Sequence, residues 1–205
     1  MQPAILAHLS KDPKLAAVIA VTELPTLATT SDDTDVYTVL LDSVVSQQLS
    51  VKAANTIFKR FCGLFPNDCP YPEMVANLSD EELRAVGLSR QKAGYIRNVA
   101  RYWQDHNLQD TDWDSLTDQE IIHLLTPIKG VGSWTVEMLL MFSLRRPDVF
   151  APDDLGIQQG MIRIYELEEK GNALRKKMTQ IAEAWRPYRT YACRYIWRYK
   201  DTKQG

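Results

Sequence analysis

Apolar residues recur along most of this chain at the spacing of helices, three and four positions apart. Between residues 36 and 45 they form two parallel rows at i, i+4 and i+8, and similar spacing recurs through 51–65 and 93–103. Ser79 and Thr117 each precede a glutamate by three residues, which predicts capping boxes at two more helix starts. No segment alternates with a period of two, and there is no Asn-Gly or Asp-Gly turn. The pattern therefore predicts an all-α protein of about nine or ten helices.

The composition is that of a folded chain with an uneven charge distribution. Its 205 residues, 45% hydrophobic and 24% charged, suffice for one domain or for two small ones that share a core. The net charge of −2 excludes a strongly basic field over the whole protein, so a nucleic acid would have to bind a local patch. Residues 105–120 are acidic, whereas residues 171–205 carry a net charge of +7. Either run is also typical of a solvated helix face.

The sequence shows no metal-binding or targeting pattern. Its three cysteines include no CxxC pair, which argues against a disulfide framework or a zinc knuckle and excludes a four-cysteine iron–sulfur cluster. The N-terminus has no basic segment before a long apolar core, and no apolar stretch is long enough to cross a bilayer. We therefore expect a cytoplasmic protein, nuclear if it is eukaryotic, with no membrane partner.

Residues 117–143 predict a helix, a short hairpin and a second helix. The first helix ends at Pro127, and Ser133 is expected to cap the second, which is apolar nearly all round and therefore belongs in a core. Between them, Gly130 and Gly132 permit close approach of another backbone, and the N–H groups that follow can bind a phosphate. A plain turn between helices, needing glycine only to end the first one, explains the same residues.

A second short segment, residues 149–157, brings Pro152 and the pair Asp153-Asp154 to the start of a further helix. Aspartate is a preferred N-cap, so capping alone accounts for this pair.

Several stretches in this order carry a family resemblance. They are residues 127–138, residues 149–157, SQQLSVKAA at 46–54, GLSRQKAGYI at 87–96 and WRPYRTYACRYIW at 185–197. Together they resemble the helix–hairpin–helix (HhH-GPD) DNA glycosylase superfamily, and within it the 3-methyladenine DNA glycosylase II branch. The resemblance implies a two-lobed helical glycosylase fold. One lobe would comprise residues 36–153, including the helix–hairpin–helix, and the other residues 1–35 with 154–205.

The resemblance also implies a reaction. The protein is expected to flip alkylated purines of the 3-methyladenine and 7-methylguanine type out of damaged double-stranded DNA and to hydrolyse their N-glycosidic bond, acting as a monomer. Asp154 matches the catalytic aspartate, kept ionised by the helix N-terminus, where it can stabilise positive charge on the deoxyribose and position the attacking water. Asp153 would then be the cap. Trp134 stands where bifunctional relatives carry a Schiff-base lysine, so a monofunctional enzyme is expected.

The remaining site residues follow from the same resemblance. Trp134, Trp197, Met138 and Leu155 would line the base pocket, although relatives carry aromatic residues at the last two positions, and either tryptophan is also explained as core. The DNA contacts would be Lys129, Gly130, Val131, Gly132, Ser133 and Thr135, with Gln47 and Gln48 at the end of an apolar helix. Gln48 matches the side chain that fills the gap left by the flipped nucleotide, although polar residues at a helix end need no such role. Main-chain carbonyls of Thr126, Ile128 and Val131 match positions that hold a monovalent cation, and no other cofactor is expected.

Residues 188–199 interleave four tyrosines with arginines. The tyrosines form one stripe, which is more typical of a core than of a stacking platform, and we expect some of the arginines to contact DNA.

Three alternatives remain open: a glycosylase for uracil or oxidised purines, a non-catalytic helix–hairpin–helix DNA-binding protein, and a helical interaction protein without a DNA role.

Overall fold

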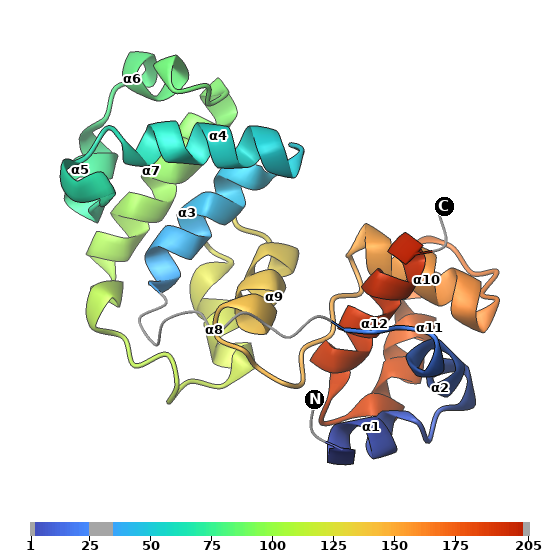
Figure 1. The fold of residues 1–205 in the computed structure, drawn as a ribbon. Coiled ribbons are helices and arrows are strands. Elements are labelled where there is room, and N and C mark those ends of the chain that lie inside the picture. Colours follow the sequence, from blue (N-terminus) through green and yellow to red (C-terminus); the bar gives the residue numbers. More distant parts are fainter. Residues whose placement is uncertain (1–2, 25–34, 203–205) are drawn as a thin grey trace. The chain divides into compact units, whose positions relative to one another are not determined.

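The computed structural model describes residues 3–24 and 35–202, which hold twelve α-helices and three 3₁₀ helices and no strand (Figure 1). The all-α prediction is confirmed. There are more helices than the spacing predicts because short turns divide some runs. For example, Ser79 begins α6 (Asp80–Ala85) directly after α5 (Pro72–Asn77), through the predicted capping box with Glu82.

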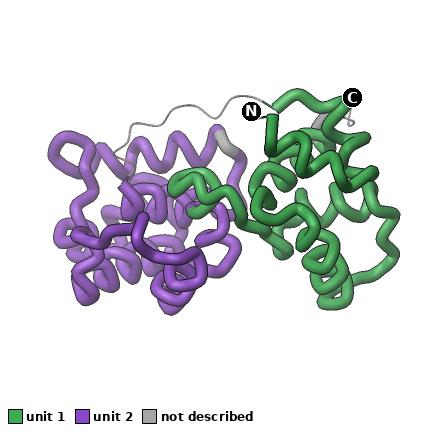
Figure 2. The backbone as a smooth tube through the Cα atoms, turned by 90° about the horizontal axis from the view of Figure 1, so that it is seen from below, with its two compact units in different colours: residues 1–30, 140–205 green, residues 31–139 purple. Residues whose placement is uncertain are grey.

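The chain forms two compact units (Figure 2): residues 1–30 with 140–205, and residues 31–139. The division falls inside a helix, well before the boundary at residue 153 expected from the sequence. Residues 140–153 join the C-terminal segment because Thr190 accepts a hydrogen bond from the Val149 N–H (3.0 Å) and donates one to the Arg146 carbonyl (2.7 Å). Residues 25–34, assigned from the sequence to the lobe of residues 1–35 and 154–205, lie outside the described residues.

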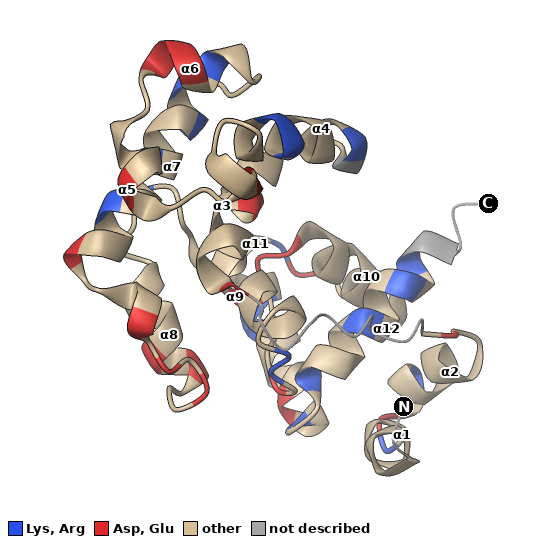
Figure 3. Cartoon of the chain, turned by 60° about the vertical axis from the view of Figure 1, so that its left-hand side comes forward, with Lys and Arg blue, Asp and Glu red and all other residues tan. Residues whose placement is uncertain are grey.

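The unit of residues 31–139 is built around two long helices that pack together, α3 (Val36–Ser46) and α7 (Arg90–Asp105) (Figure 1). All the apolar residues that set the helical spacing of 36–45 and 93–103 are buried. The unit also contains α4 (Val51–Cys62), η1 (Pro66–Asp68), α5, α6, η2 (Leu108–Asp110), α8 (Asp118–Leu125) and most of α9 (Ser133–Phe142). The acidic run 105–120 lies at the end of α7, around η2 and at the start of α8 (Figure 3).

The predicted helix–hairpin–helix is present as α8, a turn and α9. Thr117 and Glu120 form the expected capping box of α8, whereas Ser133 is the first residue of α9 rather than a residue flanking it. Gly130 has φ +108°, and a Cβ there would lie 2.3 Å from Cγ of Tyr95. Nothing lies within 4 Å of the corresponding position at Gly132. The first glycine is therefore required by the fold, and the second leaves open space beside the backbone.

The other unit packs α10 (Leu155–Tyr165) against α12 (Arg189–Thr202), and α2 (Pro13–Ala20) against both. It also holds α1 (Pro3–Leu9), α11 (Gly171–Ala182) and η3 (Glu183–Trp185). Asp12 caps α2 and accepts hydrogen bonds from the Tyr165 hydroxyl (2.6 Å) and the Trp185 indole (3.0 Å). Burial opposes ionisation here, but these hydrogen bonds hold the pKa of Asp12 below its usual value. The carboxylate thus ties the N-terminal helices to the C-terminal segment.

None of the helices within residues 3–24 and 35–202 combines the length and apolar character needed to cross a membrane.

Candidate functional site

Asp154 is the N-cap of α10, and its carboxylate is held by two donors. Its Oδ1 accepts hydrogen bonds from the Ile157 N–H (2.8 Å) and from the Trp197 indole N–H (2.7 Å). The prediction that Asp153 is the cap is therefore wrong. Asp153 is exposed and forms an ion pair with Arg175 instead. Asp154, the expected catalytic residue, is therefore the carboxylate that the N-terminus of α10 holds in place.

Gly156 makes room for the contact between Trp197 and Asp154. A Cβ at this position would lie 2.8 Å from Cδ1 of the Trp197 ring and 3.1 Å from Oδ1 of Asp154, so any larger residue must displace the indole. The Trp197 ring also lies 5.7 Å from the Phe142 ring, centroid to centroid. Leu155, an expected pocket residue beside this cluster, is 66% exposed. Sequence reasoning missed Gly156, although a glycine in the first turn of a helix was an available signal.

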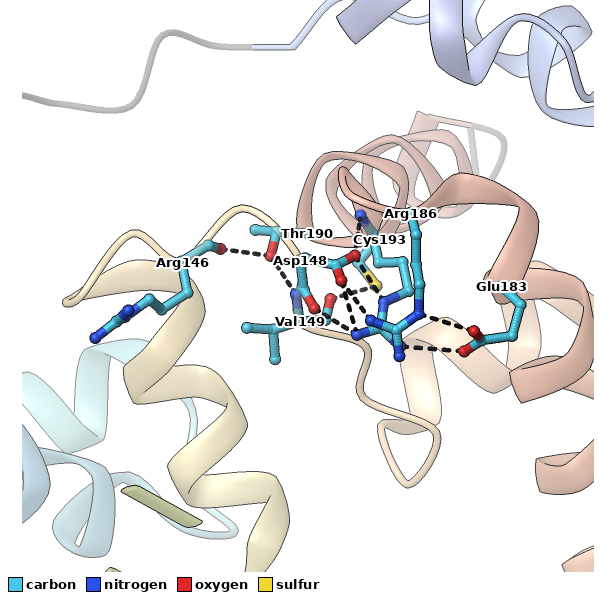
Figure 4. Close-up of polar contacts among 8 residues, drawn as sticks. Arg146, Asp148, Val149, Glu183, Arg186, Thr190 and Cys193 are labelled. Carbon is cyan, nitrogen blue, oxygen red and sulfur yellow. Dashed lines mark hydrogen bonds and ion pairs between the residues drawn. The ribbon is translucent and has the colours of Figure 1, made fainter. Parts of the chain in front are cut away.

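The loop that leads to Asp154 is anchored to α12 by a second polar cluster (Figure 4). The Asp148 carboxylate accepts from Nε of Arg189 (2.8 Å) and from Nη1 of Arg186 (2.6 Å), and Arg186 also pairs with Glu183 (2.8 Å). Three of the basic residues of 171–205, namely Arg175, Arg186 and Arg189, thus pair with acids of the same unit. Their arrangement argues for a role in holding the loop rather than for DNA contacts.

A cavity of about 630 Å³ lies in the other unit, between residues of α3 and α9. Trp134 and Met138, both expected in the base pocket, line it together with Asp42, Ser43, Ser46, Gln47, Gln48, Leu49, Gly132 and Thr135. Trp134 is 38% exposed, so the expectation of a helix buried on all sides fails for this face of α9. Thr135 is only 3% exposed, which argues against a direct contact with DNA.

Asp42 is a cavity residue that sequence reasoning missed. Burial raises the pKa of its carboxyl, while a hydrogen bond from Ser46 opposes this shift. Its Oδ1 is buried without a hydrogen-bond partner among the described residues. An unpaired buried oxygen is costly unless a proton or a ligand satisfies it. The available signal was a single carboxylate inside the apolar pattern of residues 36–45.

The hairpin presents main-chain groups at the same end of α9. Lys129, Gly132 and Ser133 are exposed, whereas Ile128 and Val131 are 2% and 4% exposed, so the turn buries its apolar side chains and leaves backbone outside. Helix geometry leaves the N–H groups in the first turn of α9 without intrahelical acceptors, which makes this end suited to an anion. Gln47 Nε2 donates to the carbonyl of Gly130 (3.0 Å) and thereby links the end of α3 to the hairpin.

No group of three or more His, Cys, Asp or Glu side chains among the described residues is arranged to hold a metal ion.

The arrangement matches a known family. A family model described as "HhH-GPD superfamily base excision DNA repair protein" covers residues 41–187. A protein of Schizosaccharomyces pombe named DNA-3-methyladenine glycosylase 1 is 38% identical over 79% of this chain and 71% of its own length. The chain belongs to the HhH-GPD superfamily. A second relative, YfjP of Bacillus subtilis, is 33% identical to this HhH-GPD protein over 81% of this chain. The match spans 59% of the length of YfjP.

Solved structures of HhH-GPD proteins have the same fold over nearly the whole chain. A DNA-3-methyladenine glycosidase from Bacillus halodurans aligns with a TM-score of 0.83 at 35% identity, covering 98% of this chain and 90% of that one. The S. pombe 3-methyladenine DNA glycosylase Mag1, solved in complex with abasic DNA, aligns with a TM-score of 0.76 at 34% identity. That alignment covers 95% of both chains.

Proposed function

We propose that this protein is a DNA glycosylase that flips alkylated purines, of the 3-methyladenine and 7-methylguanine type, out of duplex DNA and hydrolyses their N-glycosidic bond. The observation that carries the proposal is the Asp154 carboxylate, fixed at the N-terminus of α10 by two N–H donors. The names of the relatives described above support the substrate class, and the comparisons do not favour the alternative lesions or a non-catalytic role. The site of action would be the cytoplasm, or the nucleus of a eukaryote.

In this mechanism Asp154 acts on the sugar rather than on the base. Loss of the base develops positive charge on the deoxyribose, which a fixed carboxylate stabilises without reorganising. The same carboxylate can orient a water molecule and accept its proton as the water attacks the sugar. The two hydrogen bonds to Oδ1 hold the carboxylate in one orientation through both steps.

Substrate recognition is assigned to the other unit and to the residues beside Asp154. The backbone of Gly130, Val131, Gly132 and Ser133, with Lys129, would bind a DNA phosphate. Gln48 would fill the gap left by the flipped nucleotide, and Gln47 would contact DNA beside it. Trp134 would offer an electron-rich face to a cationic alkylated base in a cavity that Met138 also lines, and Leu155 and Trp197 would complete the contacts beside Asp154. The protein is proposed to act on damaged double-stranded DNA as a monomer.

A monovalent cation at the hairpin fits the residues present. The turn is closed by a hydrogen bond from the Val131 N–H to the Ile128 carbonyl (2.9 Å), and both side chains are buried. Carbonyl oxygens of a well-held turn are ligands that hard cations accept, and Thr126, Ile128 and Val131 would supply them. The cation would add positive charge where a DNA phosphate binds.

Release of free bases from methylated duplex DNA tests the proposed function directly. The wild-type protein is expected to release methylated purines and to leave uracil and 8-oxoguanine in matched oligonucleotides. If the protein released only uracil, or only 8-oxoguanine, that base would be its substrate instead. Salt-dependent DNA binding without any release would instead indicate a non-catalytic binding protein.

Borohydride treatment during turnover is expected to trap no covalent complex between the protein and damaged DNA. Trp134, at the position matching the Schiff-base lysine, cannot form an imine with the sugar, so the product should be an intact abasic site. A lysine-dependent glycosylase in the same reaction serves as the positive control. A trapped adduct that disappears in Lys129→Met would show that this hairpin lysine acts as the nucleophile.

Trp197→Phe is expected to lower the single-turnover rate of base release by about 10- to 100-fold, the loss typical of one hydrogen bond to a charged group. The phenyl ring keeps most of the packing but removes the N–H that reaches Asp154. DNA affinity should remain within a factor of about two, because no phosphate contact is changed. An unchanged rate would show that Trp197 acts only through its aromatic surface.

A further inference from the structure

The loop that carries Gln48 is held in an unusual backbone conformation. α3 ends at Ser46, Gln47 is its C-cap, and Gln48 has φ +58° although it is not a glycine. The left-handed region is sparsely populated by residues with side chains and persists only where the surroundings impose it. The side chain of Gln48 is exposed, so the contacts that impose this conformation must act on its neighbours.

Lys92 makes the most direct of these contacts. Its Nζ, reaching from the first turn of α7, donates to the carbonyl of Val45 and to the carbonyl of Gln47, both at 2.6 Å. These carbonyls belong to the last turn of α3, where helix geometry leaves acceptors without intrahelical donors and where a positive charge is favoured. Burial lowers the pKa of Lys92, which marks the ammonium as partly withdrawn from water by this contact.

The same face of α7 also holds the hairpin. Tyr95 lies one turn after Lys92, and its ring packs so closely on Gly130 that a Cβ there would clash. Asn98, one turn further, donates to the carbonyl of Lys129 (3.2 Å). Gln47 connects the loop directly to the hairpin by donating to the carbonyl of Gly130 (3.0 Å). Positions 92, 95 and 98 of one helix thus hold both the loop and the hairpin.

We propose that Lys92 is a positioning residue for base flipping, which sets the Gln47–Gln48 loop in register with the phosphate-binding hairpin. The inference rests on the proposed function, since it concerns how that function opens the duplex. If Gln48 enters the base stack, insertion is more favourable when the loop already has its bound conformation. A loop that must first become ordered loses part of the free energy of insertion. Lys92 would act through this loop and not on the base itself.

The effect should depend on how firmly the lesion is stacked and paired. Unstacking costs most for a correctly paired nucleotide and least for a mismatched one. If the Gln47–Gln48 loop is held less firmly, the release of 7-methylguanine paired with cytosine should therefore become slower. Its release from a mispair with thymine should stay nearly unchanged. A general loss of folding or of catalysis would lower both rates equally.

The experiment compares Lys92→Met, Lys92→Arg and the matched control Arg101→Met, which removes an exposed cation from the same helix. Lys92→Met is expected to lower single-turnover release from the paired lesion by about 10-fold and from the mispaired lesion by less than about 2-fold. Lys92→Arg should restore most of the paired rate, and Arg101→Met should change neither rate.

Equal rate losses on both duplexes, or no loss on either, would overturn the proposal. If the wild type released no base from either duplex, the proposed function would fail first. The inference is then judged on DNA unstacking alone, by the fluorescence of 2-aminopurine beside an abasic-site analogue. Wild type and Arg101→Met should raise this fluorescence when they bind, and Lys92→Met should raise it less at equal saturation. Identical signals would reject the role of Lys92.

Discussion

Replacing Asp154 with Asn is expected to lower base release by at least about 10³-fold while the fold and DNA affinity are retained, since the carboxylate charge supplies the main electrostatic and acid–base contribution. Asn is the same size, is as good an N-cap as Asp, and keeps an oxygen that can accept from Ile157 and Trp197. The substitution therefore removes the charge and little else. Single-turnover rates on methylated duplex DNA, with Kd and Tm of the same preparations, provide the measurement.

Asp153→Asn is the matched control for this experiment. It removes a neighbouring carboxylate whose exposed ion pair with Arg175 contributes at most about 1 kcal/mol, so base release should be unchanged. A folded and fully active Asp154→Asn would reject Asp154 as the catalytic residue. If Asp153→Asn were the inactive variant instead, the catalytic role would belong to the neighbouring carboxylate.

Gly130→Ala is expected to lower the free energy of unfolding by about 2–4 kcal/mol, because the added Cβ meets the Tyr95 ring and the left-handed backbone is strained for alanine. For a chain of this length that corresponds to a decrease in Tm of about 5–15 °C. DNA affinity should fall as well, since relief of the clash moves the hairpin or α7. Thermal unfolding and DNA titration measure the two effects.

Gly132→Ala separates stability from binding. Its Cβ would meet nothing within 4 Å, so Tm should stay within about 1 °C of wild type, as for other unstrained surface changes. If the open space beside Gly132 admits a DNA backbone, affinity should nevertheless fall by about 3- to 10-fold, the loss of one modest contact. Unchanged affinity in Gly132→Ala would show that the phosphate lies elsewhere on the hairpin.

Local signals in the sequence determined much of this protein. The spacing of apolar residues predicted α3 and α7 together with the faces they bury, and Ser79 and Thr117 marked two helix starts correctly. These features depend on neighbours within one or two turns, which a linear pattern records. The hairpin, the Asp-Asp segment and three further stretches, all in the same order, likewise indicated the family.

Only the tertiary structure decided which polar groups meet. Besides the local Ile157 N–H, Asp154 accepts a hydrogen bond from an indole 43 residues further along, and the need for Gly156 follows from that same ring. The apolar pattern of α9 could not show that one side of it, at Trp134, faces a cavity shared with Asp42 on α3. No pattern in the sequence indicated that Lys92 would reach the carbonyls at the end of α3. Contacts of this kind join segments far apart in the chain, so their donors and acceptors can be matched only once packing has brought the backbones together.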